Sequence, residues 1–219
     1  MIKILDCKNS NYLSKLKLIL EKRRLKSRVN TDIVIKVVKD IKKNKKKALL
    51  KYEKKFSKNI KIKISKDEYL NSIRQLDPKV KKAIDFAYNR IIKFHKNQKV
   101  SNFKFKDKLN NLFEYKFLPI ESVGIYVPAN LPSTLLMNAI PAKIAKVKKI
   151  VLANPKQNGK LNSAVLYAAK KLNIKEIHSM GGAQAIASLA YIQNVNKIVG
   201  PGNDYVVKAK KEVFGDVGI

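Results

Sequence analysis

The feature that most constrains the fold is a regular alternation of short apolar runs and helical segments that begins at residue 123. Each apolar run precedes a segment of helical periodicity, and the unit repeats about every 25 residues. The four runs are VGIYV (123–127), KIVLA (149–153), EIHSM (176–180) and KIVG (197–200). Strands that are regularly followed by helices predict βαβ units, and therefore an α/β fold with a parallel sheet.

Right-handed crossovers place the strand-to-helix corners of such a sheet along one edge, where ligands of open α/β sheets bind. Three polar residues meet at that edge. Tyr126 ends the first strand, Gln184 follows the Gly181-Gly182 corner, and Asn203 follows the Gly200-Pro201-Gly202 corner. Helix N-termini at the same edge offer free backbone N–H groups to an anion.

Each of these residues also has a purely structural explanation. Tyr126 suits a buried strand as a core aromatic, and Asn203 is a good helix N-cap. Gln184 lies in AQAIASLAY, a segment that is apolar nearly all round and therefore buried, where its amide needs hydrogen-bond partners in the protein or in a ligand. The pattern of residues alone leaves both explanations open.

The N-terminal 122 residues lack the alternation. A basic amphipathic helix is expected within residues 1–28, with Leu13, Leu16, Leu18, Ile19 and Leu20 as its apolar side. Helical periodicity then runs from a cap at Asn30 or Thr31 to Ser57, interrupted by KKNKKK, which we expect to be a solvated connection between two helices.

Three further elements are expected before residue 121. Period-two alternation in NIKIKISK predicts an edge strand or a half-buried strand over 59–66. Residues 66–98 predict two helices hinged at Asp77-Pro78, with Asp77 as the cap of the second helix. Alternation on both sides of a polar turn predicts a β-hairpin over 103–120.

The net charge of +32 raises the hypothesis of a nucleic-acid-binding protein. Only five of the 48 basic residues are Arg, the residue that forks onto phosphates and guanines. The chain is rich in Lys, Ile and Asn, which together suggest an AT-rich coding sequence. The lysines are therefore expected to form a solvated surface and not a selected binding face. We therefore expect no nucleic-acid partner.

Several classes of protein are excluded or disfavoured by what the sequence lacks. No apolar run reaches the roughly 20 residues that span a bilayer, and the N-terminus lacks a signal-peptide pattern, so we expect a cytoplasmic protein without a membrane partner. Cys7 is the only cysteine, and His95 and His178 lie far apart, which argues against a zinc site within this chain. No Gly-x-Gly-x-x-Gly follows the first strand, and Asn154 stands where an acidic residue would hold a ribose, so motifs alone do not indicate NAD.

Three stretches nevertheless resemble histidinol dehydrogenase. They are ESVGIYVPANLPSTLLMNAIPAKIAKVKKIVLANP, EIHSMGGAQAIASLAY and KIVGPGNDYVVKAKKEVFG. The order and spacing of YVP, LMNAIPA, GGAQAIA and VGPGN are highly specific to that family, and the likeness continues upstream through ALLKYEKKF and AIDFAYNRIIKFH.

The resemblance implies an oxidoreductase that converts L-histidinol to L-histidine, the last step of histidine biosynthesis, by two hydride transfers to NAD⁺. Members of the family are zinc-dependent homodimers with two incomplete Rossmann-like domains. By resemblance, Tyr126, Gln184 and Asn203 match the positions that contact NAD. The implied organisation is an N-terminal helical segment (1–24), the first part of a large α/β domain (25–122) and a Rossmann-like NAD-side domain (123–219).

The chain departs from the family at two places. The loop at Ala129-Asn130 is shorter than the glycine-rich loop of the family. The sequence ends at GDVGI, before the family's AGPSE-like segment, and the family's zinc ligands and catalytic Glu-His pair match no residue here. We therefore expect an N-terminal half that is not catalytically competent alone, working as a homodimer or with a complementary C-terminal half. The alternatives are a non-catalytic scaffold, half of a split enzyme, or a basic nucleic-acid-binding protein.

Overall fold

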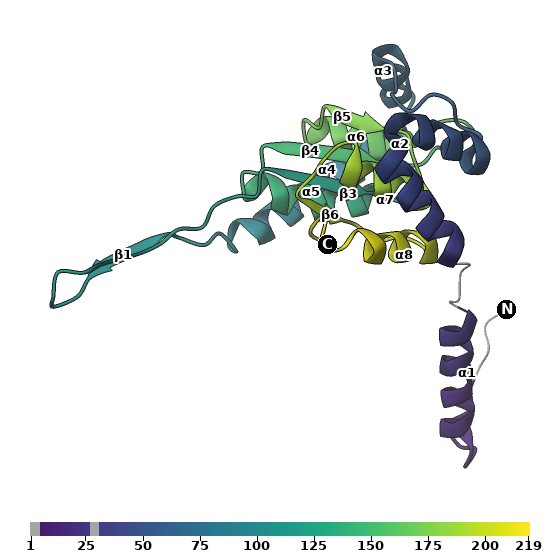
Figure 1. Ribbon diagram of the computed structural model, residues 1–219, viewed down its shortest axis with the longest axis horizontal. Coiled ribbons are helices and arrows are strands. Elements are labelled where there is room, and N and C mark those ends of the chain that lie inside the picture. The colour runs from purple at the N-terminus through teal and green to yellow at the C-terminus, as the bar shows by residue number, and fades with distance from the viewer. Residues whose placement is uncertain (1–4, 27–30) are drawn as a thin grey trace.

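The computed structural model describes residues 5–26 and 31–219, and its centre is a four-stranded parallel sheet (Figure 1). The strands are β3 (Ser122–Tyr126), β4 (Lys149–Ala153), β5 (Glu176–His178) and β6 (Lys197–Val199). They lie in the order β5-β4-β3-β6, and every neighbouring pair is parallel. The predicted α/β fold with a parallel sheet is confirmed.

Each strand of the predicted alternation is followed by a helix. The helices are α5 (Pro132–Ile144), α6 (Ser163–Lys171), α7 (Gly182–Tyr191) and α8 (Asp204–Val213). Helices α5 and α6 cover one face of the sheet with the outer helix α4 (Pro78–Lys96), while α7 and α8 cover the other face with α2 (Thr31–Ser57) (Figure 1). The result is a layered arrangement in which both faces of the sheet are buried.

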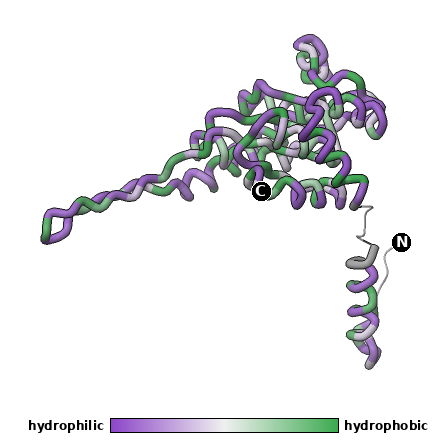
Figure 2. The backbone as a smooth tube through the Cα atoms, in the orientation of Figure 1, coloured by the Kyte–Doolittle hydropathy of each residue, from purple (hydrophilic) through white to green (hydrophobic). Residues whose placement is uncertain are grey.

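The alternation of side chains along the strands divides the core in two. Val123 and Ile125 of β3 join the cluster beneath α5 and α6, whereas Tyr126 joins the cluster beneath α7 and α2. All five residues of β3 are buried, as a central parallel strand requires. Figure 2 shows hydrophobic residues gathered in this central region of the chain.

The helix α2 confirms the expected break in the lysine run, but the break is a kink and not a connecting loop. Lys45 has φ 46° and ψ −127°, far from helical values, while the residues on either side remain helical. Val34, Val37, Val38 and Ile41 before the kink are all buried in the α7 side of the core. Of the two cap candidates, Asn30 lies outside the described residues.

The hinge between the next two helices is confirmed. Helix α3 (Lys66–Arg74) ends shortly before Asp77, whose carboxylate accepts a hydrogen bond of 2.7 Å from the backbone N–H of Lys79 at the start of α4. Pro78 occupies the first turn of α4, where its missing N–H leaves no hydrogen bond unmade.

The prediction of a strand over 59–66 is wrong. This segment is extended, but its ladder is limited to one antiparallel bridge between Lys63 and His178, beside a hydrogen bond of 2.6 Å from Ser179 N to Ile62 O. Ile62 and Ile64 are half-buried and pack against the two core clusters, whereas Ile60 is 75% exposed. A strand requires a neighbour along its whole length, and β5 is only three residues long.

The predicted hairpin is confirmed as β1 (Phe103–Lys106) paired antiparallel with β2 (Leu112–Tyr115), which projects from the body of the molecule (Figure 1). Its aromatic side chains stack in cross-strand pairs, Phe103 on Tyr115 and Phe105 on Phe113, yet all four remain exposed. The helix α1 (Tyr12–Lys26) likewise exposes Leu13, Leu16, Leu18 and Leu20. Both elements keep apolar surface uncovered within the described chain.

No helix in residues 5–26 and 31–219 combines the length and the apolar content that crossing a membrane requires. The expected division into segments 1–24, 25–122 and 123–219 stays a prediction.

Gly200 stands at the closest approach of β6 to the neighbouring strand. Its φ is +106°, and a Cβ at this position would collide with the carbonyl oxygen of Tyr126. We expect Gly200→Ala to lower the free energy of unfolding by about 2 kcal/mol or more, since it combines a strained backbone with a steric clash. Urea denaturation would measure the loss.

Gly215→Ala is the matched control. Gly215 has a similar φ of +99°, but nothing lies within 4 Å of its would-be Cβ. Its substitution should cost only the backbone strain, about 1 kcal/mol. Equal losses for the two variants would contradict the importance of the contact with Tyr126.

Candidate functional site

A cavity of about 430 Å³ lies at the carboxyl end of the sheet, where β3 and β6 are neighbours. The chain leaves β3 toward β4 on one side, and β6 returns to pair with β3 on the other side. This reversal of strand order is the position at which doubly wound sheets bind their ligands. Residues at or just after the carboxyl ends of all four strands line the cavity together with residues of α2. They are Ile33, Val34, Val37, Phe56, Ser57, Tyr126, Pro155, Gly181, Gly182, Ala183, Gln184, Asn203 and Tyr205.

The structure therefore brings Tyr126, Gln184 and Asn203 to one cavity, as the sheet topology predicts. This juxtaposition is a property of the fold and does not by itself identify a ligand. Which contacts each side chain makes decides what the cavity can hold.

Tyr126 is 6% exposed and ends β3 with its ring in the α7 side of the core. Its hydroxyl oxygen lies 3.4 Å from the backbone N of Gly182, from which it accepts a long hydrogen bond. Burial raises the pKa of this phenol, with a smaller contribution from the neighbouring carboxylate of Glu53. The neutral hydroxyl keeps its own proton available for donation toward the cavity.

Gln184 is 3% exposed, and its amide has a protein partner. Its Nε2 donates to Oε1 of Glu53 at 2.9 Å and lies 3.5 Å from the hydroxyl of Ser57. Its Oε1 accepts no hydrogen bond from the residues that the structure describes. The amide is therefore half satisfied by the protein, and its oxygen is free to meet a ligand.

Glu53 of α2 is the residue that sequence analysis missed. Its side chain is 0% exposed, and besides Gln184 it accepts a hydrogen bond of 2.9 Å from the backbone N–H of Gly181. Burial raises its pKa above the usual value, and the donors around it oppose that shift. One signal was available in the sequence, because Glu53 follows Leu49 by four positions and so shares the buried side of the helix.

Asn203 acts as the N-cap of α8. Its side-chain oxygen accepts from the backbone N–H of Val206 at 3.2 Å, and the residue as a whole is exposed beside the cavity. The N-cap role expected from the sequence is therefore confirmed for the side-chain oxygen of Asn203. The amide nitrogen remains available on the side that faces solvent.

Asn154 is excluded from a ribose-binding role by its contacts. It is fully buried, and its Nδ2 donates to the carbonyl oxygens of Val127 at 2.9 Å and Pro128 at 3.0 Å. It thereby holds the start of the short loop that contains Ala129-Asn130. Its Oδ1 is a buried acceptor for which the described residues supply no donor.

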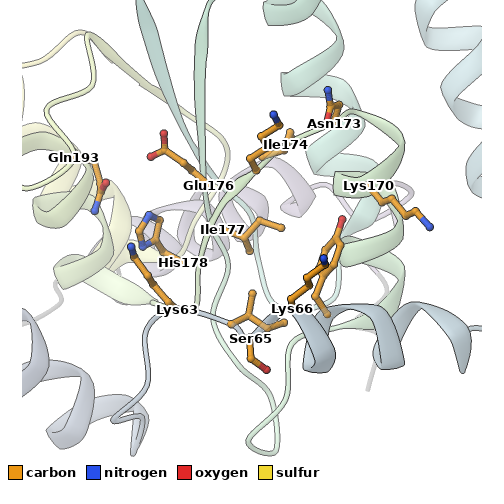
Figure 3. Close-up of a pocket in the computed structure, with 13 residues that line it drawn as sticks. Lys63, Ser65, Lys66, Lys170, Asn173, Ile174, Glu176, Ile177, His178 and Gln193 are labelled. Atoms are coloured by element: carbon orange, nitrogen blue, oxygen red, sulfur yellow. The ribbon is translucent and has the colours of Figure 1, made fainter.

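A larger cavity, of about 840 Å³, lies elsewhere, at the free edge of β5 (Figure 3). Lys63, Glu176, His178 and Gln193 surround one end of it. Burial lowers the pKa of His178, which keeps its imidazole neutral. None of the three residues singled out from the sequence lines this cavity, so its size does not make it the functional site.

Among residues 5–26 and 31–219, no group of three or more His, Cys, Asp or Glu side chains is placed to hold a metal ion. The chain thus offers no described ligand set to which the zinc implied by the resemblance could be assigned.

The cap at Asn203 gives a first prediction for the site. Asn203→Ala should lower the free energy of unfolding by about 1 kcal/mol, since the N–H of Val206 loses its acceptor. Asn203→Asp should retain stability because a carboxylate caps equally well and suits the helix dipole. Chemical denaturation of both variants measures this, and equal stability of Asn203→Ala and the parent would refute the capping role.

Buried Glu53 gives a prediction on pH. A carboxyl whose pKa is raised in the folded state binds its proton more tightly there, so stability falls as the pH rises from about 4.5 through the raised value. Glu53→Gln cannot ionise, and its stability relative to the parent should therefore increase across that window and then level off. Urea unfolding at several pH values would show it. Glu121→Gln, at the exposed position just before β3, is the control, and a pH-independent difference for Glu53→Gln would contradict the prediction.

Comparisons with known proteins place the chain in a family. The family model described as histidinol dehydrogenase matches residues 20–219. The histidinol dehydrogenase of Pelagibacter ubique is 58% identical over 226 aligned residues that cover 100% of this chain and 53% of the relative. That of Rhodospirillum rubrum is 35% identical, with coverages of 98% and 52%.

A solved structure agrees with these relatives. The crystal structure of histidinol dehydrogenase from Elizabethkingia anophelis matches with a TM-score of 0.81 and 38% identity, over 86% of this chain and 46% of that one. The chain spans about half the length of the curated relatives it matches. By sequence and by fold, the chain belongs to the histidinol dehydrogenase family.

Proposed function

We propose that this chain supplies the NAD-binding part of a histidinol dehydrogenase, which oxidises L-histidinol to L-histidine. The observation that carries the proposal is the convergence of Tyr126, Gln184 and Asn203 on one cavity at the switch point of the sheet. Membership of the family supports the choice of reaction. In that reaction NAD⁺, when bound, accepts hydride from the substrate.

The residues present fit a dinucleotide. The cavity has an apolar wall from Val34, Val37 and Phe56, which suits the face of a planar ring. The hydroxyl of Tyr126 and the Oε1 of Gln184 offer one donor and one acceptor toward the same space. Such a mixture of apolar surface and a few oriented polar groups is typical of cofactor sites.

Two helices begin beside this cavity and suit the anionic part of the cofactor. Helix α7 begins at Gly182 and α8 at Asp204, and the first turn of each leaves backbone N–H groups without partners within the helix. The positive end of the helix dipole adds to their attraction for a pyrophosphate. Gly182, with φ +60°, and the nearby Gly202 carry no side chain that would stand in the way.

The reaction of the family also requires zinc and acid–base groups. No described cluster fits zinc, so no step is derived through the metal. We propose that the zinc site and the acid–base groups come from a complementary C-terminal part, and that the complete enzyme is a homodimer in the cytoplasm. The uncovered aromatic face of the β1-β2 hairpin is consistent with an assembled partner.

Direct measurement of NAD⁺ binding to the 219-residue chain tests the proposal. Tyr126→Phe and Gln184→Met should each weaken binding by about 3- to 10-fold, the value of one hydrogen bond. Asn203→Asp, which keeps the helix cap, should weaken binding as well, because it adds a negative charge near the pyrophosphate. Isothermal titration calorimetry provides the affinities.

Glu121→Gln at the opposite end of β3 serves as the control and should bind as the parent does. Absence of measurable NAD⁺ binding by the folded parent chain would refute the proposal. So would unchanged affinity in all three site variants.

A further inference from the structure

The carboxylate of Glu53 has no cationic partner among the described residues, although the chain holds 48 Lys and Arg. Its described neighbours are neutral donors. They are the backbone N–H of Gly181 and Nε2 of Gln184, both at 2.9 Å, Nδ2 of Asn59 at 3.5 Å, and the hydroxyl of Ser57. Burying a carboxylate without a counter-charge is unfavourable for stability. Its presence therefore calls for an explanation other than stability.

The position of Glu53 suggests that explanation. Its hydrogen bonds reach from α2 to the start of α7, across 128 positions to Gly181 and 131 positions to Gln184. It thus joins the helix that walls the cavity to the corner that carries Gln184. Both ends of the contact are buried, so solvent does not compete with it.

Further hydrogen bonds hold the carboxylate's surroundings in place. Asn59 donates to the carbonyl oxygen of Ser179 at 2.6 Å, and the Ser179 hydroxyl donates to the carbonyl oxygen of Lys61 at 2.7 Å. The segment after α2 is thereby fastened to the corner between β5 and α7. Glu53 sits in a network whose members all have partners, which restricts its own rotation.

A carboxylate imposes one orientation on a neighbouring amide. The side chain of Gln can present either its NH₂ or its oxygen in the same direction by a half-turn, but Oε1 of Glu53, which contacts Gln184, also accepts the backbone N–H of Gly181, a group that only donates. Beside Glu53 the NH₂ of Gln184 must therefore face α2. The oxygen lies beside Gly182, 3.1 Å from the position that a Cβ of Gly182 would occupy, and both residues line the cavity.

We infer that Glu53 is a positioning residue that fixes Gln184 as a hydrogen-bond acceptor toward the cavity. The group that Gln184 recognises is accordingly a donor. If the proposed NAD-binding function holds, that donor is the carboxamide NH₂ or a ribose hydroxyl of the cofactor, and this identification alone rests on the proposed function.

Nuclear magnetic resonance tests the orientation without any ligand. The side-chain NH₂ of Gln184 should exchange with solvent about tenfold or more slowly than that of exposed Gln75, which serves as the internal reference. Glu53→Gln retains an acceptor oxygen and should preserve this protection. Glu53→Met, of similar length but without an acceptor, should abolish it. Rapid exchange in the parent chain, or protection that survives in Glu53→Met, would overturn the inference.

NAD⁺ affinity tests the functional consequence through a double-mutant cycle. If Glu53 acts through Gln184, then Glu53→Met weakens binding by about 3- to 10-fold, and the double variant with Gln184→Met binds no more weakly than Gln184→Met alone. Glu53→Gln should restore affinity to within about 2-fold of the parent. Losses that add fully would show a separate structural role and overturn the inference.

The two experiments separate the two ideas. A parent chain that protects the Gln184 amide but binds no NAD⁺ refutes the proposed function and leaves the positioning role standing. A parent chain that binds NAD⁺ but does not protect the Gln184 amide refutes the positioning role and leaves the proposed function standing. Urea unfolding of each variant checks that it remains folded under the conditions of measurement.

Discussion

The parallel pairing of β3 with both β4 and β6 is the interaction on which the rest of the structure depends. β3 is buried over its whole length, and Tyr126 at its end is paired with Ala153 of β4. On the other side Ile125 is paired with Val199, next to Gly200. Because β6 returns to β3 and not to β5, the end of the sheet opens at a point flanked by two helix N-termini, α7 and α8.

The outer helix α2 converts this open end into a cavity. Its apolar residues before the kink pack into the α7 side of the core, and Phe56 and Ser57 line the cavity after it. Within the described residues, the buried carboxylate of Glu53 and the hydroxyl of Ser57 make the polar contacts between α2 and the start of α7. Packing fixes where α2 lies, and hydrogen bonding then fixes how the neighbouring amide is turned.

Local signals predicted most of the elements. The cap at Asp77, the hairpin around β1 and β2, and the four strand–helix units are each encoded within a few consecutive residues, and all are present. The segment 59–66 shows where such signals fail. Its period-two pattern is suitable for a strand, but pairing depends on a neighbour that the pattern does not specify, and only one bridge forms.

The site divides in the same way. The positions of Tyr126, Gln184 and Asn203 at one edge followed from the rule that parallel strands share a direction, so their convergence could be predicted. The partner of Gln184 could not, because Glu53 precedes it by 131 positions and belongs to a separate helix. Likewise, the sequence showed only that Asn154 stands where an acidic residue would hold a ribose, and its contacts with Val127 and Pro128 showed that it supports a loop.

The sequence by itself determined the α/β class, the order of the strand–helix units, the edge where Tyr126, Gln184 and Asn203 converge, and the family. These depend on periodicity, on turn residues and on motifs, all of which are local along the chain. The tertiary structure decided which face α2 covers, that the break at Lys45 is a kink, and that a buried carboxylate turns the amide of Gln184. Those outcomes depend on contacts between residues more than a hundred positions apart or on packing around them, and no local pattern specifies such contacts.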